Sequence, residues 1–409
     1  MKVVIIGGGA AGMVAAIKAS RNNEVTIIEK NKNVGKKILI TGNGKCNYFN
    51  DDFAVKHYNS KNLELLDEVI TEYNKEKVLD FFDKIGVIPK VKNGYYYPLS
   101  NQAVSIQNIL LTELKLQKVE MKTEEIILAI EYKNKQFLIK TDKNIYKADK
   151  VILATGSKAG FDTIYDDIGY KIAASFGHTI IPVLPGLVQL KGKANYFKEW
   201  SGIRCDAAIS LFIDDKLVRE EIGELQLTNY GISGICTMQL SNYAVPAINF
   251  KKDVQVKINF LNSLNIKTEK EFINFINKRN SKLKDRTLDE LFDGVVNYKL
   301  VNLILKLVGI KNSNKLENIK EETLKELAKL FIAFPLRLND FNSYKDAQIS
   351  LGGVSLNEVN LANFESKKQE GLFIIGELLD VNGDCGGYNL GFAWLSGILA
   401  GESIGGKHD

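Results

Sequence analysis

The chain has 409 residues, of which 45% are hydrophobic and 25% are charged, so its composition is that of a folded soluble protein with room for two or three domains. The formal net charge of +5 comes from 54 Lys and Arg residues against 49 Asp and Glu residues, spread along the chain. This spread indicates solvated faces rather than a stripe for nucleic acid, so we expect a small-molecule partner and leave the oligomeric state open.

Cysteine and histidine usage narrows the chemistry further. Four cysteines form no C-x-x-C pair and no metal-ligand spacing: Cys46, Cys205, Cys236 and Cys385. We therefore expect reduced thiols, with neither zinc nor a structural disulfide. Three scattered histidines give almost no support for a hydrolytic triad: His57, His178 and His408. A strand is expected from residue 2, and no stretch approaches the ~20 apolar residues of a membrane span, so we expect no signal peptide, no anchor and a cytoplasmic location.

The first thirty residues carry the strongest motif. An apolar run at 2–6 leads into GGGAAG at 7–12, which fits G-x-G-x-x-G, and helical composition over 13–20 precedes a second strand over 24–28. In such a turn Gly7 permits the tight bend, Gly9 lets the main chain approach a pyrophosphate, and Gly12 lets the helix pack closely on the strand. The stretch predicts the first βαβ unit of a dinucleotide fold.

Glu29 ends the second strand, about the expected ~20 residues into the unit. A carboxylate there accepts hydrogen bonds from a ribose diol and would repel a 2′-phosphate, so the position favours FAD or NAD over NADP. A glycine-rich turn in an ordinary α/β protein would leave Glu29 unexplained.

The following stretch, residues 31–50, is too polar and too rich in glycine for a core element, so we predict a loop. It is placed to cross the cofactor and to offer main-chain N–H groups. Lys36 and Lys45 are either ligands of phosphate or flavin oxygens or surface lysines, and the spacing alone does not decide between the two. The P-loop pattern is absent.

Periodicity predicts helices at 63–73, 77–85 and 102–116, a strand or hairpin over 87–98, and three or four short antiparallel strands over 119–146. Three consecutive tyrosines, at 95–97, place at least one ring on each face of the hairpin. One of them can line a pocket, but a core-plus-surface placement is the more ordinary interpretation.

Residues 150–156 (KVILATG) are predicted to form a short buried strand that stops at Thr155-Gly156, a second candidate contact with the nucleotide. A helix is expected over 165–176, capped near Gly177, and His178 is interpreted as structural.

From about residue 190 to 334 the pattern changes to strand-like alternation followed by lysine-rich helical spacing, which predicts an inserted domain. It contains no second G-x-G-x-x-G, so a separate Rossmann unit for NAD is not expected. The stretch 227–234 (LTNYGISG) either turns back toward the cofactor or simply connects a hairpin.

The last seventy residues combine a predicted glycine turn at 350–355, a buried strand at 371–375 ending at Gly376-Glu377, a tight loop at 380–389 and an apolar helix over 390–404. Asn389 is the expected N-cap of that helix, with Gly386-Gly387 before it. The positive end of such a helix suits the electron-rich N1–C2=O2 edge of a reduced flavin. A capped helix that merely closes the domain is compatible with the same residues.

Five stretches together resemble the bacterial flavoprotein family of the aminoacetone-oxidase and BaiN-like type: GGGAAG at 7–12, GKKILITGNGKCN at 35–47, ATG at 154–156, LTNYGISG at 227–234 and GELLDVNGDCGGYN at 376–389. The resemblance runs end to end. It implies a glutathione-reductase-like, Rossmann-type α/β fold with a discontinuous FAD domain (1–189 and 335–409) and an inserted substrate domain (190–334), whose β-barrel part spans about 190–262 and whose helical part spans about 263–334.

The resemblance also implies non-covalent FAD and a set of cofactor-binding residues. Those that it assigns to the pyrophosphate and the adenosine ribose are Gly7, Gly9, Ala10, Ala11, Gly12, Glu29 and Lys30. Those that it assigns to the ribitol and the flavin are Lys36, Lys37, Thr41, Gly42, Gly44, Lys45, Cys46, Asn47, Gly376, Glu377, Gly387, Tyr388 and Asn389. Ile127 would approach adenine, and Ala154, Thr155 and Gly156 the diphosphate.

The chain departs from the family at three places. Gly94 is followed by Tyr95 where the family often has Arg, so a clamp for a substrate carboxylate or phosphate is in doubt. Residues 164–169 (IYDDIG) replace a turn richer in glycine and serine, and Phe161 stands where Pro is common.

The leading hypothesis is a soluble FAD-dependent oxidoreductase that reduces a small organic substrate at the flavin N5, with NAD(P)H as a transient electron donor and with the substrate entering between the flavin and the inserted domain. No acid or base is assigned; the candidates are Cys46, Tyr96 and Tyr388, and Cys46 would react only if Lys45 lowered its pKa.

The alternatives are an oxygen-dependent amine oxidase of the aminoacetone type, an RNA-modifying flavoprotein whose basic helices at 267–329 dock RNA, and an FAD-bound regulator without catalytic activity.

Overall fold

The computed structural model describes residues 1–160 and 167–406 of the chain. The chain divides into two compact units: the first joins Met1–Leu184 with Ile349–Asp409, and the second is Pro185–Gln348. The second unit is thus an insertion in the first.

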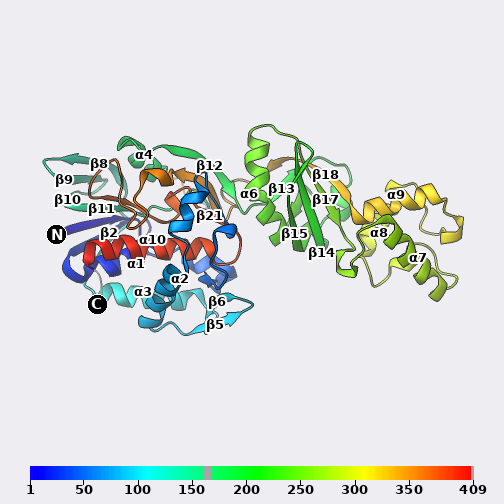
Figure 1. Ribbon diagram of the computed structural model, residues 1–409, viewed down its shortest axis with the longest axis horizontal. Coiled ribbons are helices and arrows are strands. Elements are labelled where there is room, and N and C mark those ends of the chain that lie inside the picture. Colours follow the sequence, from blue (N-terminus) through cyan, green and yellow to red (C-terminus); the bar gives the residue numbers. More distant parts are fainter. Residues whose placement is uncertain (161–166, 407–409) are drawn as a thin grey trace. The chain divides into compact units, whose positions relative to one another are not determined.

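A parallel sheet with the strand order β20-β11-β1-β2-β7 forms the centre of the first unit. Figure 1 labels two of its strands, β2 and β11. Its strands are β1 (Lys2–Ile6), β2 (Glu24–Glu29), β7 (Glu120–Thr123), β11 (Lys150–Leu153) and β20 (Leu372–Ile374). The sequences of β1 (KVVII) and β11 (KVIL) are nearly continuous apolar runs, as expected for parallel strands covered on both faces. The predicted Rossmann-type α/β fold is confirmed.

The first helix of the chain packs against the last. Figure 1 shows α1 (Ala10–Ala19) and α10 (Tyr388–Gly405) side by side. Three glycines of α10 at four-residue spacing face the main chain of α1: a Cβ at Gly397 would lie 2.5 Å from the Ala11 oxygen, one at Gly401 2.6 Å from the Ala15 oxygen, and one at Gly405 2.2 Å from the Lys18 oxygen. Only a residue without a side chain permits this approach.

A buried ion-pair cluster fixes the same two helices to a third. Glu402 of α10 bonds to Lys18 of α1 at 2.9 Å and to Lys77 of α2 (Glu72–Lys84) at 2.8 Å. The side chains of Lys18 and Glu402 are only 11% and 15% exposed, so removal of one partner would leave a poorly solvated charge.

Smaller elements surround the central sheet. The helices are α3 (Ala103–Leu116) and α4 (Ile168–Ser175). The strands form the sheets β10-β9-β8, β3-β6-β5, β12-β19 and β21-β4. Their bounds are β3 (Phe49–Asn50), β4 (Tyr58–Asn59), β5 (Pro89–Lys92), β6 (Tyr95–Pro98), β8 (Ile127–Lys133), β9 (Gln136–Thr141), β10 (Ile145–Ala148), β12 (Ile180–Gly186), β19 (Ile349–Val354) and β21 (Asn382–Gly383).

Several local predictions need correction. The helix expected at 63–73 is a 3-10 segment, Leu63–Glu68, followed by α2, whose start is set by Thr71 accepting a hydrogen bond from the Asn74 N–H. The glycine turn expected at 350–355 is the fully buried strand β19, because sheet pairing overrides the turn propensity of Gly352-Gly353. The first strand of 119–146 is β7, which pairs in parallel with β2 rather than antiparallel with its successors.

The second unit is built on a closed barrel with the strand order β13-β16-β15-β14-β17-β18. Its strands are β13 (Leu190–Gly192), β14 (Arg204–Ile213), β15 (Lys216–Leu227), β16 (Gly231–Ser233), β17 (Val254–Asn259) and β18 (Phe334–Phe341). The stretch 227–234 is the hairpin between β15 and β16, which is the simpler of the two interpretations. The barrel closes only when β18 pairs with both β13 and β17, so this unit extends past the predicted boundary at residue 334.

The helices of this unit are α5 (Phe197–Trp200), α6 (Ile235–Asn249), α7 (Glu269–Lys282), α8 (Tyr298–Leu307) and α9 (Glu321–Ile332). Of these, α6 and α9 pack on barrel strands, whereas α7 and α8 pack on other helices. The start of α7 is fixed by a capping box in which Thr268 and Glu271 bond to each other's backbone N–H groups. Phe272, Phe292 and Phe331 stack at centroid distances of 4.4–6.1 Å and form the core of the helical part. Across residues 1–160 and 167–406, no helix combines the length and apolarity needed to cross a membrane.

The glycine contact predicts that Gly401→Ala destabilises the protein. The added methyl would lie 2.6 Å from the Ala15 oxygen and from the Lys18 Cβ. Overpacking costs about 1–3 kcal/mol, which exceeds the ~0.5–1 kcal/mol gained by replacing a helical glycine with alanine. Urea denaturation of the apoprotein should show the loss, whereas Ser403→Ala, at an exposed position of the same helix, should not. Equal stability of the two variants would contradict the close contact.

Candidate functional site

The glycine turn between β1 and α1 has the geometry of an anion site. Gly7 has φ +102°, and a Cβ there would lie 2.4 Å from the Ala154 oxygen. A Cβ at Gly12 would lie 2.0 Å from the Gly7 oxygen, so this glycine is required by packing. A Cβ at Gly9 would meet nothing within 4 Å. The helix α1 begins at Ala10, and its N-cap is Gly9, which has no side chain to cap the helix. The first N–H groups of the helix are therefore left for a ligand.

Glu29 lies beside this turn and is 8% exposed. Its Oε2 accepts the Gly8 N–H at 2.8 Å, and its Oε1 accepts the Asn31 N–H and Nδ2–H at 2.8 and 2.6 Å. The carboxylate therefore fastens the end of β2 to the glycine turn. Asn31 escaped the sequence analysis, although Asn two residues after an acid is a recognised partner of this kind.

Ile127, predicted to approach adenine, is the first residue of β8 and is buried. It is tied to the end of β2 through Glu125, whose N–H donates to the Glu29 main-chain oxygen at 3.1 Å. The Glu125 carboxylate is itself buried and accepts hydrogen bonds from Thr141 and Tyr146. These contacts place Ile127 on the same side of the unit as Glu29.

The segment 35–47 is held in a compact irregular conformation. The Gly35 N–H donates to the Gly8 oxygen at 2.7 Å, which joins it to the glycine turn. A 3-10 segment, Ile38–Gly44, contains left-handed residues at Gly42 and Asn43, and Gly44 also has a positive φ. The Thr41 hydroxyl donates to the Ile38 oxygen at 2.7 Å. The predicted ligands that lie exposed along this edge are Lys30, Lys36, Gly42, Gly44 and Lys45.

Cys46 is fully buried, and burial raises the pKa of its thiol to about 11. The hydrogen bond with Thr41 acts in the opposite direction and is the smaller effect. At neutral pH this cysteine is a thiol, so the proposed activation by Lys45 finds no support in the structure.

The loop before α10 ends in a left-handed glycine pair, Gly386 with φ +136° and Gly387 with φ +94°. The N-cap of α10 is Gly387, not Asn389 as predicted, and it makes no side-chain cap hydrogen bond. Asn389 instead closes the loop, because its Oδ1 accepts the Gly383 N–H and its Nδ2 donates to the Gly383 oxygen, both at 2.8 Å. The N-terminal end of α10 is thereby left for a ligand.

Contacts between residues far apart in sequence bring these pieces together. Lys37 pairs with Glu377 at 2.7 Å. A Cβ at Gly376 would lie 2.9 Å from the Ala11 Cβ, and one at Gly387 would lie 3.0 Å from the Asn47 Oδ1. The glycine turn, the segment 35–47 and the C-terminal loop therefore lie next to one another within the first unit.

The Ala154-Thr155-Gly156 turn borders this site on the β11 side. Ala154 contacts Gly7 as described, and the Thr155 Oγ1 would lie 2.0 Å from a Cβ at Gly169, so α4 packs closely against the turn. Phe161 and residues 164–166, where the chain departs from the family, lie outside the described residues, as does the start of the helix predicted at 165–176.

Two tyrosines proposed as weak catalytic candidates have different surroundings. Tyr96 packs against Tyr48 and Phe49 at 6.0 and 6.1 Å and donates to Asp51 at 3.4 Å, which indicates a structural role. Burial, and next the charge of Asp52, raise the pKa of Tyr388 far above its usual value, so this side chain stays a neutral phenol. It is 5% exposed and begins α10.

The residues present fit FAD. The uncapped N-termini of α1 and α10 offer N–H groups to a pyrophosphate and to an electron-rich ring edge, and the open position at Gly9 admits the phosphates. In addition, the Asn47 Oδ1 is buried and has no hydrogen-bond partner among the described residues, so it is an acceptor that remains to be satisfied.

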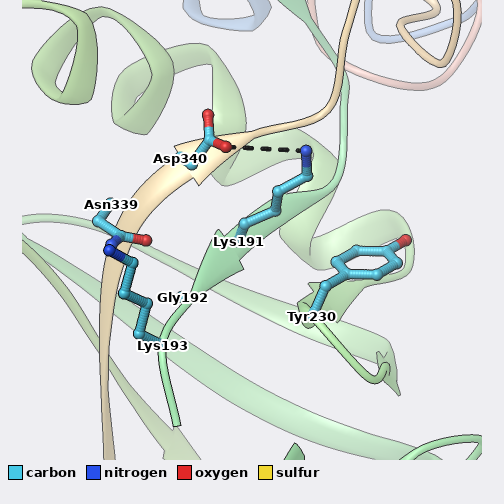
Figure 2. Close-up of a pocket in the computed structure, with 6 residues that line it drawn as sticks. All are labelled: Lys191, Gly192, Lys193, Tyr230, Asn339 and Asp340. Atoms are coloured by element: carbon cyan, nitrogen blue, oxygen red, sulfur yellow. Dashed lines mark ion pairs between the residues drawn. The ribbon is translucent and has the colours of Figure 1, made fainter.

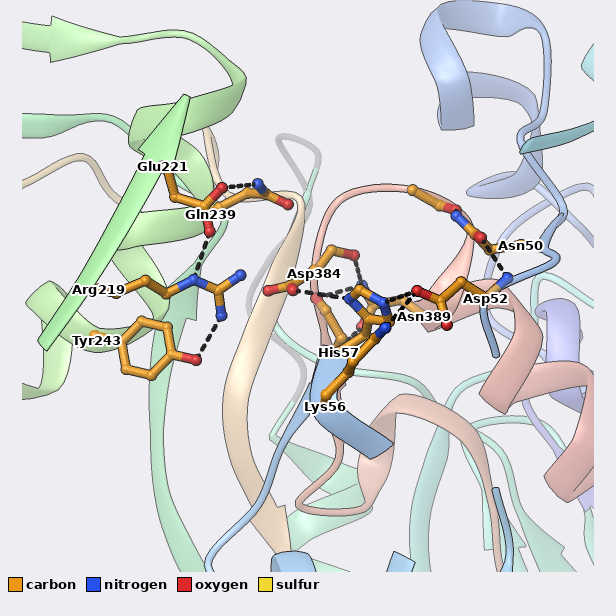
Figure 3. Close-up of polar contacts among 12 residues, drawn as sticks. Asn50, Asp52, Lys56, His57, Arg219, Glu221, Gln239, Tyr243, Asp384 and Asn389 are labelled. Atoms are coloured by element: carbon orange, nitrogen blue, oxygen red, sulfur yellow. Dashed lines mark hydrogen bonds and ion pairs between the residues drawn. The ribbon is translucent and has the colours of Figure 1, made fainter. Parts of the chain in front are cut away.

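The second unit carries a polar network of its own, between β15 and α6 (Figure 3). Arg219 donates to Glu221 at 2.5 Å and to the Tyr243 hydroxyl oxygen at 2.6 Å, and Gln239 donates to the other Glu221 oxygen at 2.5 Å. Because the Tyr243 oxygen accepts from a guanidinium, its own O–H is polarised toward an acceptor outside these four side chains. No sequence motif pointed to this group.

A pocket of about 310 Å³ opens at another part of the same unit (Figure 2). It is lined by Lys191, Gly192, Lys193, Tyr230, Asn339 and Asp340. The pocket has two lysines, Lys191 and Lys193. The ammonium group of Lys191 lies 3.8 Å from the Asp340 carboxylate and forms an ion pair with it. The sequence analysis did not identify this pocket.

The chain is similar to known proteins over nearly its whole length. The family model described as HI0933-like protein Rossmann domain matches residues 1–403. The chain is 37% identical over 405 residues to the 3-dehydro-bile acid delta(4,6)-reductase of Clostridium scindens, covering 98% of each. It is 27% identical over 405 residues to the ribosomal RNA dihydrouridine synthase of Escherichia coli, covering 98% of this chain and 97% of the relative.

Among solved structures, 3-ketosteroid-delta4-(5alpha)-dehydrogenase from Rhodococcus jostii aligns with a TM-score of 0.50 at 13% identity, covering 99% of this chain and 96% of the other. At that identity the likeness shows the fold alone. Two findings show which family the chain belongs to. One family model matches nearly the whole chain, and a 37% identical relative is covered over 98% of its length. The chain belongs to the HI0933-like Rossmann-domain family, and it is an FAD-dependent oxidoreductase.

Proposed function

We propose that the protein reduces an activated carbon–carbon double bond in a small organic substrate, with NAD(P)H as the electron donor. The observation that carries the proposal is the 37% identity, over 98% of both chains, to a protein named as a reductase of a bile acid. When bound, FAD supplies the hydride chemistry, and the protein supplies binding, orientation and electrostatics.

The chain's own residues divide that work. Gly7, Gly9 and the start of α1 hold the pyrophosphate, and Glu29 holds the adenosine ribose. The uncapped end of α10 would hold the ring edge that becomes electron-rich on reduction. The Asn47 Oδ1 is an acceptor, so it would pair with a donor N–H of the ring instead. Since the sequence contains one G-x-G-x-x-G motif, the nicotinamide donor binds transiently rather than in a second Rossmann unit. We retain the cytoplasm as the expected location.

We assign substrate binding to the second unit. Its Arg219–Tyr243 pair offers a polarised O–H, which suits the carbonyl oxygen that activates a conjugated double bond. Tyr243→Phe removes that hydroxyl, so KM for a ketone substrate should rise about tenfold while the affinity for FAD stays unchanged. Steady-state kinetics with a cyclic enone, together with FAD titration, check both values; an unchanged KM would exclude this role.

A second candidate is reduction of uridine in RNA, which two relatives favour by name at 27% and 26% identity. Dihydrouridine formation is also the reduction of a conjugated carbon–carbon double bond, so the cofactor chemistry would be the same. We rank it second because the identity is lower, and because basic side chains of the helical part pair with acids, as in Lys325–Glu321, Lys329–Glu269 and Lys315–Asp285.

Anaerobic titration of the purified yellow protein with NADH and NADPH, followed by admission of air, tests the proposal. A reductase should bleach with one of them and regain colour rapidly on adding a conjugated enone, but slowly in air. An amine oxidase should stay yellow with both and bleach with an amine. Rapid recolouring only with RNA would favour the second candidate, and failure to bleach with either nucleotide would contradict the proposed electron donor.

Two glycine variants test the cofactor site itself. Gly9→Ala places a methyl where the protein has open space, so the stability of the apoprotein should fall by about 1 kcal/mol or less, but FAD affinity should fall tenfold or more because the methyl occupies the phosphate approach. The control, Gly12→Ala, places its methyl 2.0 Å from the Gly7 oxygen and should destabilise the apoprotein itself. Thermal denaturation and fluorescence titration with FAD separate the two effects. Wild-type FAD affinity in Gly9→Ala would rule out this placement of the pyrophosphate.

A further inference from the structure

His57, one of the three scattered histidines, lies between two carboxylates. It ends the 3-10 segment Val55–His57, and its Nε2 is 2.8 Å from the Asp52 Oδ2 while its Nδ1 is 3.4 Å from the Asp384 Oδ2 (Figure 3). Asp384 belongs to the loop that leads into α10, so the imidazole joins two segments more than three hundred residues apart.

Exposure falls steadily along this row of three side chains. Asp52 is 53% exposed, His57 is 22% exposed and Asp384 is 3% exposed. A carboxylate in water, an imidazole at the boundary and a carboxylate in the interior thus form a path from solvent into the protein. Imidazole can accept a proton on one ring nitrogen and release one from the other, which is the property that such a path needs.

The inner end of the row is held beside the expected cofactor edge. The His57 ring stacks on Tyr388, the first residue of α10, with centroids 4.4 Å apart and planes 19° apart. The Asp384 N–H donates to the His57 oxygen at 2.9 Å, and the neighbouring residues Tyr58 and Gly383 pair as part of β4 and β21. These main-chain contacts hold the backbone around His57 in place whatever the protonation of the ring.

We propose that Asp52, His57 and Asp384 form a proton relay that supplies the site at the N-terminus of α10. The proposal rests on the proposed function, because adding hydrogen across a double bond consumes one hydride and one proton, and the proton comes from water. No electron passes through the relay.

The transfer balances bond by bond. A proton taken up by Asp52 passes to Nε2, so an O–H bond breaks and an N–H bond forms. The Nδ1–H bond then breaks, and an O–H bond forms on Asp384, from which the proton enters the site. The ring regains its starting state by returning the Nε2 proton to Nδ1 through rotation or exchange. The 3.4 Å contact must shorten for the second step, as hydrogen bonds in ligand-free sites commonly do when the site is filled.

The alternative is that His57 only clamps Tyr388, and two variants distinguish the roles. His57→Phe keeps an aromatic ring against Tyr388 but carries no exchangeable proton. Asp52→Asn changes only the outer, exposed group. Lys56→Met is the matched control, because Lys56 is 65% exposed and pairs with Asp52 at 2.8 Å without lying between Asp52 and the ring.

The main readout needs neither the natural substrate nor NAD(P)H. Each FAD-loaded protein is reduced with stoichiometric dithionite without oxygen and mixed with menadione, a quinone whose reduction to the quinol also consumes a hydride and a proton. We expect recolouring to slow about 100-fold in His57→Phe and tenfold or more in Asp52→Asn, within the usual contribution of proton transfer, and free imidazole to restore the rate. FAD affinity should stay within twofold of wild type, and Lys56→Met should react at the wild-type rate.

Other results overturn the relay. Wild-type rates in His57→Phe, or a slow rate that imidazole does not restore, would show that the ring acts only by packing. In the apoprotein, ¹⁵N shifts of the His57 ring should change at Nε2 in Asp52→Asn, and identical shifts would remove the outer link. A wild-type protein that takes up no FAD would instead defeat the proposed function and the relay with it, whereas normal FAD binding with unaltered rates defeats the relay alone.

Discussion

The close contact between α1 and α10 is the constraint on which the first unit depends. Gly397, Gly401 and Gly405 let the two backbones approach until a single methyl group would clash with a carbonyl oxygen. The buried Lys18–Glu402 pair then fixes the register of one helix along the other. Since α1 starts at the glycine turn and α10 starts directly after Gly387, this one contact sets where both helix N-termini lie relative to each other. A site for a long dinucleotide needs its two ends held at a fixed separation. Because the inserted unit separates α1 from α10 in sequence, only their packing can fix this separation.

What could be predicted from the sequence was mostly local. The βαβ unit follows from a glycine spacing and an acid at the end of a strand, because turn, helix and strand are adjacent in the chain. The sequence predicts the last helix but not its N-cap. Asn389 is a residue type that often caps helices, but here its side-chain amide forms hydrogen bonds with Gly383 and closes the loop. A similar competition explains β19, where sheet partners distant in sequence outweigh two consecutive glycines.

The remainder could not have been predicted from spacing, because it depends either on residues hundreds of positions apart or on how neighbouring elements pack together. Nothing near His57 in the sequence indicates Asp384, and nothing near Lys37 indicates Glu377. The Arg219–Glu221–Gln239–Tyr243 network arises because alternate residues of β15 face one side of α6, which requires knowing that strand and helix pack together. Patterns along the chain predict elements, whereas such groups appear only when the elements are assembled.

The charges around the expected cofactor edge favour a bound anion. Two acids there have a lysine as a neighbour: Glu377 has Lys37, and Asp52 has Lys56. The N-terminus of α10 has no acidic residue in its first turn and no side-chain cap, so its partial positive charge is not offset in the same way. A helix N-terminus stabilises a nearby anion by about 0.3–1 kcal/mol, and by up to about 2 kcal/mol when partly buried. Because Tyr388 is 5% exposed, the buried end of that range applies here. The positive end of α10 therefore favours a ring that gains negative charge on reduction, and hence favours a flavin bound there as an acceptor of hydride.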